Sequence, residues 1–450
     1  MPWSATISQL CEVLHAESVN LSEDVLTQVS SAIQTDTRKI KPGEVFLALR
    51  GEKFDGHDFV ASAIAQGALA AIVDCDYQNA DLPLLQVRNT LVAYQQLGRW
   101  WRDRLNIPVI GVTGSVGKTT TKELIAAVLA TRGRVHKTYG NFNNEIGVPK
   151  TLLELSTEDD YAVVEMAMRG EGQIAELTDI ARPNIGVITN VGTAHIELLG
   201  SEEAIARAKC ELLAQMSPDG VAILNHDNSL LMATAQEVWS GKVVTYGLAG
   251  GDIQGQIIDN ETIQVEGMQL PLPLAGRHNA SNFLAALAVA QVLGIDWSSL
   301  QNGVMVNMPT GRSQRFTLAH DIIILDETYN AAPEAMIAAL QLLADTPGKR
   351  KIAVLGAMKE LGERSPQLHQ KVGETVQRLQ LDALLVLVDG KDAEAIAESA
   401  AGIPSECFGN HADIVTRLKT FIQPGDRILF KAAHSVGLDR VVNQLRDQLL

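Results

Sequence analysis

Short apolar runs rich in β-branched residues alternate along the chain with longer stretches in which alanine and leucine recur at helical spacing. The runs are four or five residues long, the length of strands buried on both faces. The segments "KELIAAVLATRG" (122–133) and "SNFLAALAVAQVLG" (281–294) are apolar at helical spacing and carry a glycine near the end, as helices do. The pattern predicts parallel α/β sheets covered by helices, with strands at 109–112, 161–165, 185–189, 221–224, 322–325, 352–355, 384–388 and 427–430.

The chain is expected to divide into three parts. Residues 1–86 form a small α/β unit that ends near "DLPLLQVRN", and residues 87–311 form a larger parallel-sheet α/β domain. A break at "MPTGRSQR" precedes a third part, residues 312–450, which is expected to be a doubly wound, Rossmann-like domain. A chain of 450 residues is long enough for each part to bury its own core.

A glycine-framed lysine joins an apolar strand to a helix in the sequence "VIGVTGSVGKTTTKELIAAVL". Gly114 and Gly117 allow the backbone N–H groups to turn inward, toward an anion at the positive end of the helix. Lys118 would neutralise the outer phosphates of a nucleotide, and the Thr119 hydroxyl would bind Mg²⁺. The strict P-loop pattern has a glycine where this chain has Val112, so a glycine-rich turn beside a solvated lysine is the alternative. The predicted phosphate loop comprises Gly114, Ser115, Val116, Gly117, Lys118, Thr119 and Thr120.

Polar residues follow several of the expected strands directly. Glu165 ends "YAVVE", and Asn190 and His195 follow "IGVIT". In the last third of the chain, Asp326 follows "IIIL" and Lys431 follows "RILF". Each residue taken alone is more often a salt-bridge partner or a structural hydrogen-bonder. Ligands gather at the carboxyl ends of parallel strands, so the repeated placement favours a functional site there.

Composition limits the classes of partner and location. The chain carries 37 Lys and Arg against 53 Asp and Glu, a formal charge of −16, so a nucleic-acid partner is not expected. The start has neither a basic segment nor a long apolar one, and no apolar run approaches membrane-spanning length. We expect a soluble cytoplasmic protein without membrane insertion and with reduced thiols, because its four cysteines are widely separated: Cys11, Cys75, Cys210 and Cys407.

Four segments together resemble the Mur ligases of peptidoglycan synthesis. "TGSVGKTT" is similar to their ATP loop, including the absent first glycine, and residues 165–213 resemble their metal and substrate segment. "AGRHNASNFLAALAVA" (275–290) is similar to their adenine-contacting Asn motif, and "GRSQRF" (311–316) to the start of their C-terminal domain. The resemblance begins near residue 30 and covers nearly all of the chain.

Three further segments indicate a branch of the family. Residues 35–59 resemble the uridine-nucleotide-binding domain of the two later ligases, and residues 140–153 and 326–336 resemble the branch that adds D-alanyl-D-alanine. The DNPR-type motif of the tripeptide-forming branch is absent from the sequence. Ala332, where Asn is usual, and "FKAAHSVG" (430–437), where a KGS motif is usual, depart from the pattern in the C-terminal part.

The resemblance implies an ATP-dependent ligation of D-alanyl-D-alanine to the carboxylate of a UDP-N-acetylmuramoyl-tripeptide, whose third residue stays open between lysine and diaminopimelate. A carboxylate is a poor acylating agent, because expulsion of oxide is prohibitive at neutral pH. Phosphorylation by ATP gives an acyl phosphate that the dipeptide amine can attack. Two anions must meet in such a site, so neutralisation of charge is its main task.

The resemblance implies binding roles for residues in all three parts. Asn279 and Asn282 would contact adenine, and Arg312 and Asp326 would reach the phosphates and the ribose of ATP. The expected uridine-nucleotide residues, for which a solvated loop is the alternative, are Thr35, Asp36, Arg38, Asp55 and His57. The other expected substrate-binding residues are Asn141, Asn143, Asn144, Tyr329 and Asn330. A single chain supplies the whole site, so a monomer is expected.

Two Mg²⁺ ions are implied. One would lie between Thr119, Glu165 and the phosphates, and the second near His195. Mg²⁺ prefers oxygen ligands, so the second site needs an oxygen donor in addition to the imidazole. Lys209, fourteen residues after His195, is the candidate if it reacts with CO₂ to form a carbamate.

The argument for Lys209 rests on charge. An ammonium beside two cations would be repelled and has no lone pair to offer a metal, whereas nearby cations lower its pKa and favour the neutral amine that reacts with CO₂. The resemblance implies this modification at the corresponding lysine of several family members. The alternative is an exposed helical lysine paired with Glu203 or Glu211.

Three other functions compete with this interpretation. A P-loop switch or motor would use Glu165 in place of a Walker-B Asp and would release phosphate without both acceptors. A non-catalytic binding module would be expected to have lost Lys118, Glu165 or His195, all of which are present. A folylpolyglutamate-type ligase shares the loop and the C-terminal part, but would lack the "DTRKIKPGEVF" segment near the start.

Overall fold

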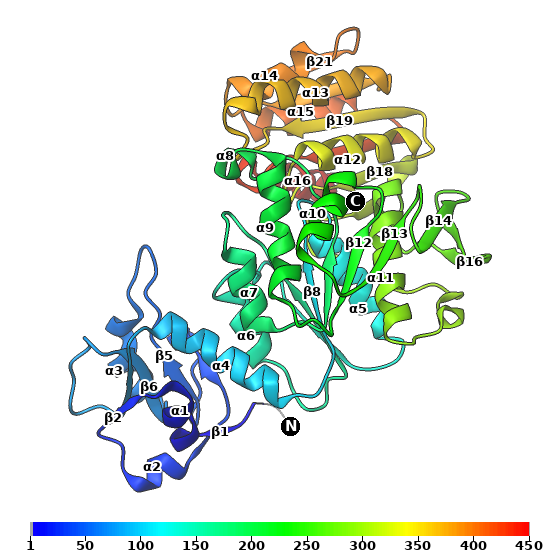
Figure 1. The fold of residues 1–450 in the computed structure, drawn as a ribbon. Coiled ribbons are helices and arrows are strands. Elements are labelled where there is room, and N and C mark those ends of the chain that lie inside the picture. The colour runs from blue at the N-terminus through cyan, green and yellow to red at the C-terminus, as the bar shows by residue number, and fades with distance from the viewer. Residues whose placement is uncertain (1–2, 450) are drawn as a thin grey trace.

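The computed structural model describes residues 3–449, which form three lobes in chain order (Figure 1). All eight predicted strands are present in two parallel-stranded sheets, so the predicted α/β class is confirmed. Two of the three larger sheets lie within the expected parts 87–311 and 312–450, and the third lies within 1–86 except for Val87 at the end of its last strand; the boundaries between the parts stay predictions. No helix of the described residues is long and apolar enough to cross a membrane.

The N-terminal lobe contains a five-stranded sheet with the order β2-β7-β6-β5-β4. The long helix α4 (Thr90–Arg104) leads from this lobe to the central one (Figure 1). Trp3 lies edge-on against both Trp100 and Trp101 of α4, with ring centroids 5.6 and 5.0 Å away. The strands of this five-stranded sheet are β2 (Glu17–Val19), β4 (Ile33–Gln34), β5 (Val45–Leu47), β6 (Ala70–Asp74) and β7 (Leu84–Val87).

The central lobe is built on a nine-stranded sheet with the order β16-β15-β14-β13-β12-β11-β8-β10-β9. Neighbouring strands are parallel from β9 to β14. Side chains of β8 alternate between two cores: Val109 packs with the layer of α4, α6, α7 and α9, whereas Ile110 packs with α5 and α11. The strands are β8 (Val109–Thr113), β9 (Val135–Lys137), β10 (Tyr161–Glu165), β11 (Ile185–Ile188), β12 (Val221–Asn225) and β13 (Lys242–Gly247). The layer helices are α5 (Lys118–Leu129), α6 (Gly147–Leu153), α7 (Gln173–Ala181), α9 (Glu202–Gln215) and α11 (Arg277–Val292).

An antiparallel extension of this sheet was not predicted. It comprises β14 (Ile253–Ile257), β15 (Thr262–Val265) and β16 (Met268–Pro271), of which β15 and β16 are antiparallel to their neighbours. These strands alternate apolar and polar residues, as in "IQGQI", because only one face is covered. A search for continuous apolar runs does not detect such strands.

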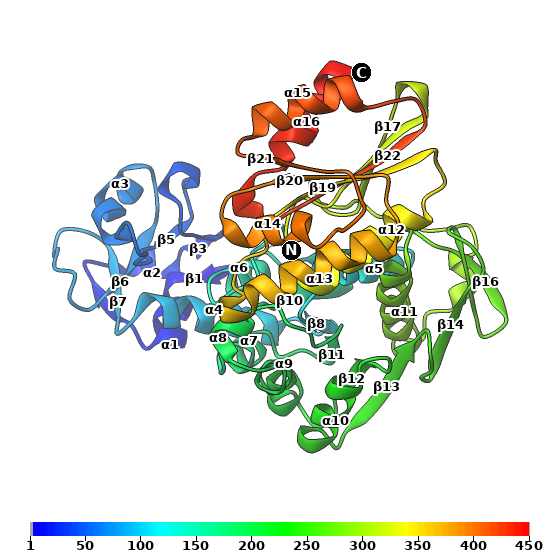
Figure 2. The same ribbon diagram turned by 90° about the horizontal axis from the view of Figure 1, so that it is seen from above.

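The C-terminal lobe has a six-stranded sheet with the order β17-β18-β22-β19-β20-β21, in which only β17 is antiparallel to its neighbour. β22 (Asp426–Lys431) lies between β18 (Ile322–Asp326) and β19 (Arg350–Gly356), so the carboxyl ends of these strands adjoin. Helix α12 (Pro333–Asp345) lies beside α11 of the central lobe (Figure 2). The remaining strands are β17 (Gln314–Leu318), β20 (Ala383–Leu387) and β21 (Ser405–Phe408).

Candidate active site

The glycine loop connects β8 to α5, as the sequence predicts. Gly114 and Gly117 both have positive φ, of 149° and 82°, and Gly117 caps the start of α5. A β-carbon on Gly114 would lie 1.9 Å from Thr189 Oγ1, so a side chain is excluded there. The loop therefore turns tightly at the amino end of a twelve-residue helix, where partial positive charge favours an anion.

Two residues at the end of β11 support the loop. Thr189 Oγ1 and Asn190 Nδ2 donate to the Val116 carbonyl at 2.6 and 3.0 Å, and Val116 N–H donates to Asn190 Oδ1 at 3.1 Å. Both ends of the Asn190 amide thus hydrogen-bond the loop backbone, although its position after a strand suggested that it would contact a bound ligand. Thr189 was not predicted, and its polarity at a strand end was the available signal.

Lys118 is folded back over the loop. Its Nζ donates to the carbonyls of Gly114 at 2.8 Å and Ser115 at 3.3 Å. The alternative of a solvated lysine is wrong, because the side chain is partly buried and hydrogen-bonded. Burial lowers the pKa of Lys118, Glu165 opposes this effect, and Arg312 adds to it. A phosphate would take the place of the two carbonyls as a partner of opposite charge.

Glu165 ends β10 with one carboxylate oxygen in use and one without a hydrogen bond. Asn143 Nδ2 donates to Oε1 at 2.8 Å, while Oε2 is buried and accepts no hydrogen bond from the described residues. The fully buried Lys122 places its Nζ 3.7 Å from Oε2. Lys122 was not predicted, because a lysine one turn beyond Lys118 reads as an ordinary helical residue.

The arrangement around Glu165 fits Mg²⁺. Among residues 3–449, no group of three or more His, Cys, Asp and Glu side chains could hold a metal ion by itself. Mg²⁺ in phosphate sites needs only one or two carboxylates, and phosphate oxygens and water complete its shell. The Oε2 atom of Glu165, which accepts no hydrogen bond from the described residues, and the hydroxyl of Thr119, which borders the same cavity, meet that requirement.

His195 lies at the start of the short helix α8 (Ile196–Leu199) and contacts the C-terminal lobe. Its Nδ1 is 2.5 Å from Glu360 Oε2, and Arg169 lies 3.4 Å from the other oxygen of Glu360. Burial lowers the pKa of His195, Lys118 lowers it further, and Glu360 opposes both. Glu360 was missed because it is 165 residues away and belongs to another lobe.

Lys209 is buried in α9, with 1% of its surface exposed. The alternative of an exposed lysine paired with Glu203 or Glu211 is therefore wrong. Glu211 accepts hydrogen bonds from the N–H groups of Gly172 and Ala175 instead. Among the described residues the Lys209 ammonium has no hydrogen bond or ion pair, and burial, aided by Lys118, holds its pKa well below the usual range.

The asparagines expected at adenine lie in α11, where it packs on α5. Asn282 Oδ1 accepts from Thr121 Oγ1 at 3.1 Å and lies against Gly117, where a β-carbon would come within 2.8 Å of it. Asn279 Nδ2 donates to the Ala275 carbonyl at 2.8 Å. Asn282 therefore also stabilises the contact between the loop and α11, and the role of both asparagines at a base stays a prediction.

The C-terminal lobe presents an aromatic and basic group toward the loop. The Arg312 guanidinium lies 3.8 Å from the ring centroid of Tyr329, and His434 stacks on the same ring at 5.4 Å. Lys431 Nζ donates to the Asn330 carbonyl at 2.9 Å. Asp326 is buried and accepts from the Thr328 hydroxyl and N–H, and burial raises its pKa against those hydrogen bonds.

A cavity of about 890 Å³ lies between the central and C-terminal lobes. It is bordered by these predicted residues: Ser115, Val116, Gly117, Lys118, Thr119, Thr120, Asn141, Asn143, Glu165, His195, Asn279, Asn282, Arg312, Tyr329 and Asn330. The predicted residues that do not border it are Gly114, Asn144, Lys209, Asp326 and the five residues of the N-terminal lobe. Segments that are far apart in the chain, from Ser115 to Lys431, thus meet around one space large enough for a nucleotide.

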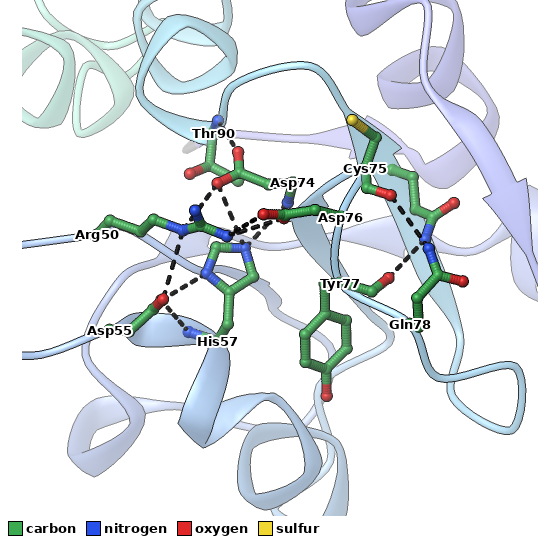
Figure 3. Close-up of polar contacts among 10 residues, drawn as sticks. Arg50, Asp55, His57, Asp74, Cys75, Asp76, Tyr77, Gln78 and Thr90 are labelled. Atoms are coloured by element: carbon green, nitrogen blue, oxygen red, sulfur yellow. Dashed lines mark hydrogen bonds and ion pairs between the residues drawn. The ribbon is translucent and has the colours of Figure 1, made fainter.

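Two residues expected to bind the uridine nucleotide belong to a polar network of the N-terminal lobe (Figure 3). His57 is buried, its Nδ1 lies 2.6 Å from Asp55 Oδ1, and its Nε2 accepts from the Asp74 N–H at 2.9 Å. Arg50 forms ion pairs with Asp55, Asp74 and Asp76. The carboxylate and the backbone N–H together assign the His57 proton to Nδ1.

The other three residues expected at the uridine nucleotide stand at the start of the segment 35–59, whereas Asp55 and His57 stand near its end. Asp36 caps a short 3₁₀ turn and pairs with the exposed Arg38 guanidinium at 2.8 Å. The Thr35 N–H donates to Gln34 Oε1 at 3.1 Å. These contacts are local, and a role of the five residues toward a nucleotide stays a prediction.

Three domains of one family match the chain in order. The Mur ligase family catalytic domain matches residues 30–102, the Mur ligase middle domain residues 112–290, and the glutamate ligase domain residues 311–434. A UDP-N-acetylmuramoyl-tripeptide--D-alanyl-D-alanine ligase of Synechocystis is 58% identical over 428 residues, which are 95% of this chain and 93% of the relative. The ligase of the same name from Escherichia coli is 37% identical over 99% of both chains.

Solved structures of MurF ligases agree over the whole fold. The structure of MurF from Acinetobacter baumannii superposes with a TM-score of 0.90 at 32% identity, covering 99% of both chains. MurF from Thermotoga maritima in complex with ADP gives a TM-score of 0.84 at 31% identity, covering 93% of this chain and 97% of that one. The chain therefore belongs to the Mur ligase family, in the branch that these MurF enzymes represent.

Proposed function

We propose that this enzyme joins D-alanyl-D-alanine to UDP-N-acetylmuramoyl-tripeptide at the expense of ATP. The products are UDP-N-acetylmuramoyl-pentapeptide for peptidoglycan synthesis, ADP and phosphate. The observation that carries the proposal is the shared cavity, in which the phosphate loop, Glu165 and His195 face Arg312 and Tyr329 of another lobe. The names of the relatives that match the full chain support it.

The chain's own residues answer the main electrostatic demand of this reaction. The tripeptide carboxylate and the γ-phosphate are both anions, and they must approach to form the acyl phosphate. Lys118 and the loop N–H groups would hold the phosphates, and the amino end of α5 adds a favourable dipole. Arg312, on the opposite wall, would balance charge from the other side. The dipeptide amine then attacks the acyl phosphate and phosphate leaves.

Mg²⁺ is part of the proposal. Thr119 and Glu165 would hold one ion at the phosphates, and His195 with a carbamate on Lys209 would hold a second. The bound ions would neutralise phosphate charge and polarise the reacting oxygens. The buried position and low pKa of Lys209 support the carbamate, because only the neutral amine adds CO₂. The catalytic residues proposed here are Lys118, Glu165, His195 and Lys209.

The remaining assignments of substrate contacts also stay proposals. Tyr329 and Asn330 would receive D-alanyl-D-alanine, because they border the cavity beside Arg312. Asn141, Asn143 and Asn144 would contact the muramoyl substrate near Glu165, since Asn143 already hydrogen-bonds that residue. The N-terminal lobe would hold the uridine nucleotide.

We also propose a monomer located in the cytoplasm. All four cysteines are free, as is usual where thiols stay reduced. The cavity is built from segments of a single chain, so a second copy has no evident part in it. A P-loop switch and a folylpolyglutamate-type ligase are disfavoured, because the relatives that match at least 95% of this chain are named UDP-N-acetylmuramoyl-tripeptide--D-alanyl-D-alanine ligases.

An ADP-release assay tests the proposal. The purified chain is incubated with ATP and Mg²⁺, with each acceptor alone and with both. A ligase releases ADP rapidly only when UDP-N-acetylmuramoyl-tripeptide and D-alanyl-D-alanine are both present, and mass spectrometry then detects the pentapeptide. Release that is independent of the dipeptide would overturn the proposal and favour a hydrolytic switch.

A further inference from the structure

The segment 192–197, which carries His195, is held from the C-terminal lobe at two points. Glu334, in the first turn of α12, accepts from the N–H and the hydroxyl of Thr193 through Oε1, at 2.8 and 2.9 Å. Glu360, after β19, contacts His195 Nδ1 through Oε2 at 2.5 Å. Its carbonyl also accepts from the Glu197 N–H at 3.4 Å. The contacts therefore flank and include His195.

The packing around these contacts is close. A β-carbon on Gly192 would lie 2.8 Å from Glu334 Cδ, so only glycine permits this approach. On its other side, Gly192 exchanges hydrogen bonds with Ser115 Oγ of the phosphate loop, at 2.9 and 3.3 Å. The segment is thus wedged between the phosphate loop and the C-terminal lobe.

Both partners of the histidine contact adopt an unusual backbone conformation. His195 has φ of 66° and Glu360 has φ of 61°, in the left-handed region that non-glycine residues seldom occupy. Such conformations cost free energy and persist where surrounding contacts hold them. The two residues are therefore held in the geometry that brings Nδ1 to the carboxylate.

The contact determines which imidazole nitrogen carries the proton. A carboxylate only accepts hydrogen bonds, so Nδ1 donates to Glu360 and Nε2 keeps its lone pair in the neutral ring. A partner on one ring nitrogen commonly sets the tautomer and orientation of a histidine whose other nitrogen binds a metal. Here the partner comes from a different lobe of the chain.

We propose that Glu360 is a positioning residue, which fixes the tautomer and orientation of His195 only while the central and C-terminal lobes are in contact. Glu334 anchors the same segment at Thr193. Closure of the two lobes would then assemble the site by presenting Nε2 of His195 to the reacting groups. The importance of this step for ligation rests on the proposed function, whereas the tautomer does not.

The tautomer is measured first, without substrate or metal. Protein labelled with ¹⁵N at histidine is compared by long-range ¹H–¹⁵N correlation in the wild type, Glu360→Ala and Glu363→Ala, and His195→Gln identifies the signal of His195. Glu363 is an exposed residue of the same loop that forms no ion pair within residues 3–449, so it is the matched control. We expect the Nδ1–H form in the wild type and the control, and a change toward the Nε2–H form in Glu360→Ala.

An unchanged Nδ1–H form in Glu360→Ala, or an Nε2–H form in the wild type, would overturn the proposal. If Glu360→Ala fails to fold, Glu360→Gln replaces it. Glutamine keeps the size of the side chain, and thermal unfolding of the variant protein reports whether the C-terminal lobe is intact. Its weaker acceptor should leave the His195 ring in a mixture of tautomers, and a pure Nδ1–H form would again count against Glu360.

Steady-state kinetics then tests the link to catalysis. We expect Glu360→Ala to lower kcat by about 10- to 100-fold, as for other partners of metal-binding histidines. KM for ATP and for the dipeptide should change by less than about threefold, because Glu360 contacts neither substrate in this scheme. An unchanged kcat would refute the coupling. If the wild type shows no ligation at all, the proposed function fails while the tautomer result stands by itself.

Discussion

Arg312 lies over the face of the Tyr329 ring, with the guanidinium carbon 3.8 Å from the ring centroid. Arg312 precedes β17 and Tyr329 follows β18, and the antiparallel pairing of Gln314 with Asp326 places both residues at the same end of the two strands. A planar guanidinium on an aromatic face keeps its N–H edges free for a phosphate. One cluster thus connects a group suited to ATP with a residue expected to contact the dipeptide.

Replacement of Arg312 should weaken the use of ATP, although the residue lies far from the phosphate loop in sequence. Hydrogen bonds to charged groups are worth about 1.5–3 kcal/mol, so Arg312→Ala should raise KM for ATP roughly ten- to a hundredfold. Arg315→Ala, at an exposed position of β17, is the control. Wild-type kinetics in Arg312→Ala would remove this residue from the ATP site.

Removal of the Lys118 charge should abolish useful ligation. Loss of one preorganised electrostatic contact commonly lowers the rate by ~10²–10³, and Lys118→Ala should fall in that range when ADP release is measured. The exposed Lys419 serves as a control for the loss of one positive charge. Turnover near that of the wild type would contradict the role assigned to the loop.

Asn330 should distinguish the two substrates. Asn330→Ala is expected to raise KM for D-alanyl-D-alanine more than KM for ATP, because Asn330 borders the cavity on the wall of the C-terminal lobe. Each KM is measured with the other substrates saturating. A larger effect on ATP would mean that the "YNAAP" segment contacts the nucleotide and that the dipeptide binds elsewhere.

Lys209→Ala should lose activity that a small anion can restore. If the lysine acts as a carbamate, bicarbonate or a short carboxylic acid can occupy the space of the missing side chain and supply an oxygen pair. The measurement is ligation rate against added acid, with Cys210→Ala as a neighbouring buried control. Failure of rescue together with a bare ammonium in a metal-bound structure would leave Lys209 as a positioning charge.

Gly114 should be far more sensitive to a side chain than Gly170. Gly114 has φ of 149° and its β-carbon would collide with Thr189 Oγ1, whereas a β-carbon on Gly170 meets nothing within 4 Å. Strain and overpacking each cost about 1–3 kcal/mol, so Gly114→Ala should lower the free energy of unfolding by about 2–6 kcal/mol. Gly170→Ala should stay within about 0.5 kcal/mol in the same urea titration. Equal free energies of unfolding for the two variants would show that the loop can accommodate a side chain at position 114.

The strands that line the site could be predicted because they are buried on both faces and read as continuous apolar runs. β14 to β16 could not, since their alternating pattern reflects one covered face. The phosphate loop could also be predicted, because its residues are consecutive in the sequence, and its glycines have the positive φ that such a loop needs. Ala332 departs from the family pattern at the N-cap of α12, where it makes no capping hydrogen bond.

Contacts between lobes could not be predicted from local patterns. Nothing in the sequence around Glu360 or Glu334 indicates that they approach His195 and Thr193, because the pairing depends on how two domains dock. The burial of Lys209 could not be predicted either, because the sequence of its helix is equally compatible with an exposed lysine at that position. Asp55 and His57 were both expected at the uridine nucleotide, but their hydrogen bond to each other and their contacts with Arg50 and Asp74 were not predicted.

The contact of Trp3 with α4 has an optical consequence. Trp3, Trp100 and Trp101 are three of the five tryptophans of the chain, and their rings lie within 5.0 to 6.2 Å of one another. Three of the five indoles therefore absorb ultraviolet light where Trp3 packs on α4, and a change in that packing is expected to change their emission. The chain thus carries a built-in optical label for the packing of Trp3 on α4.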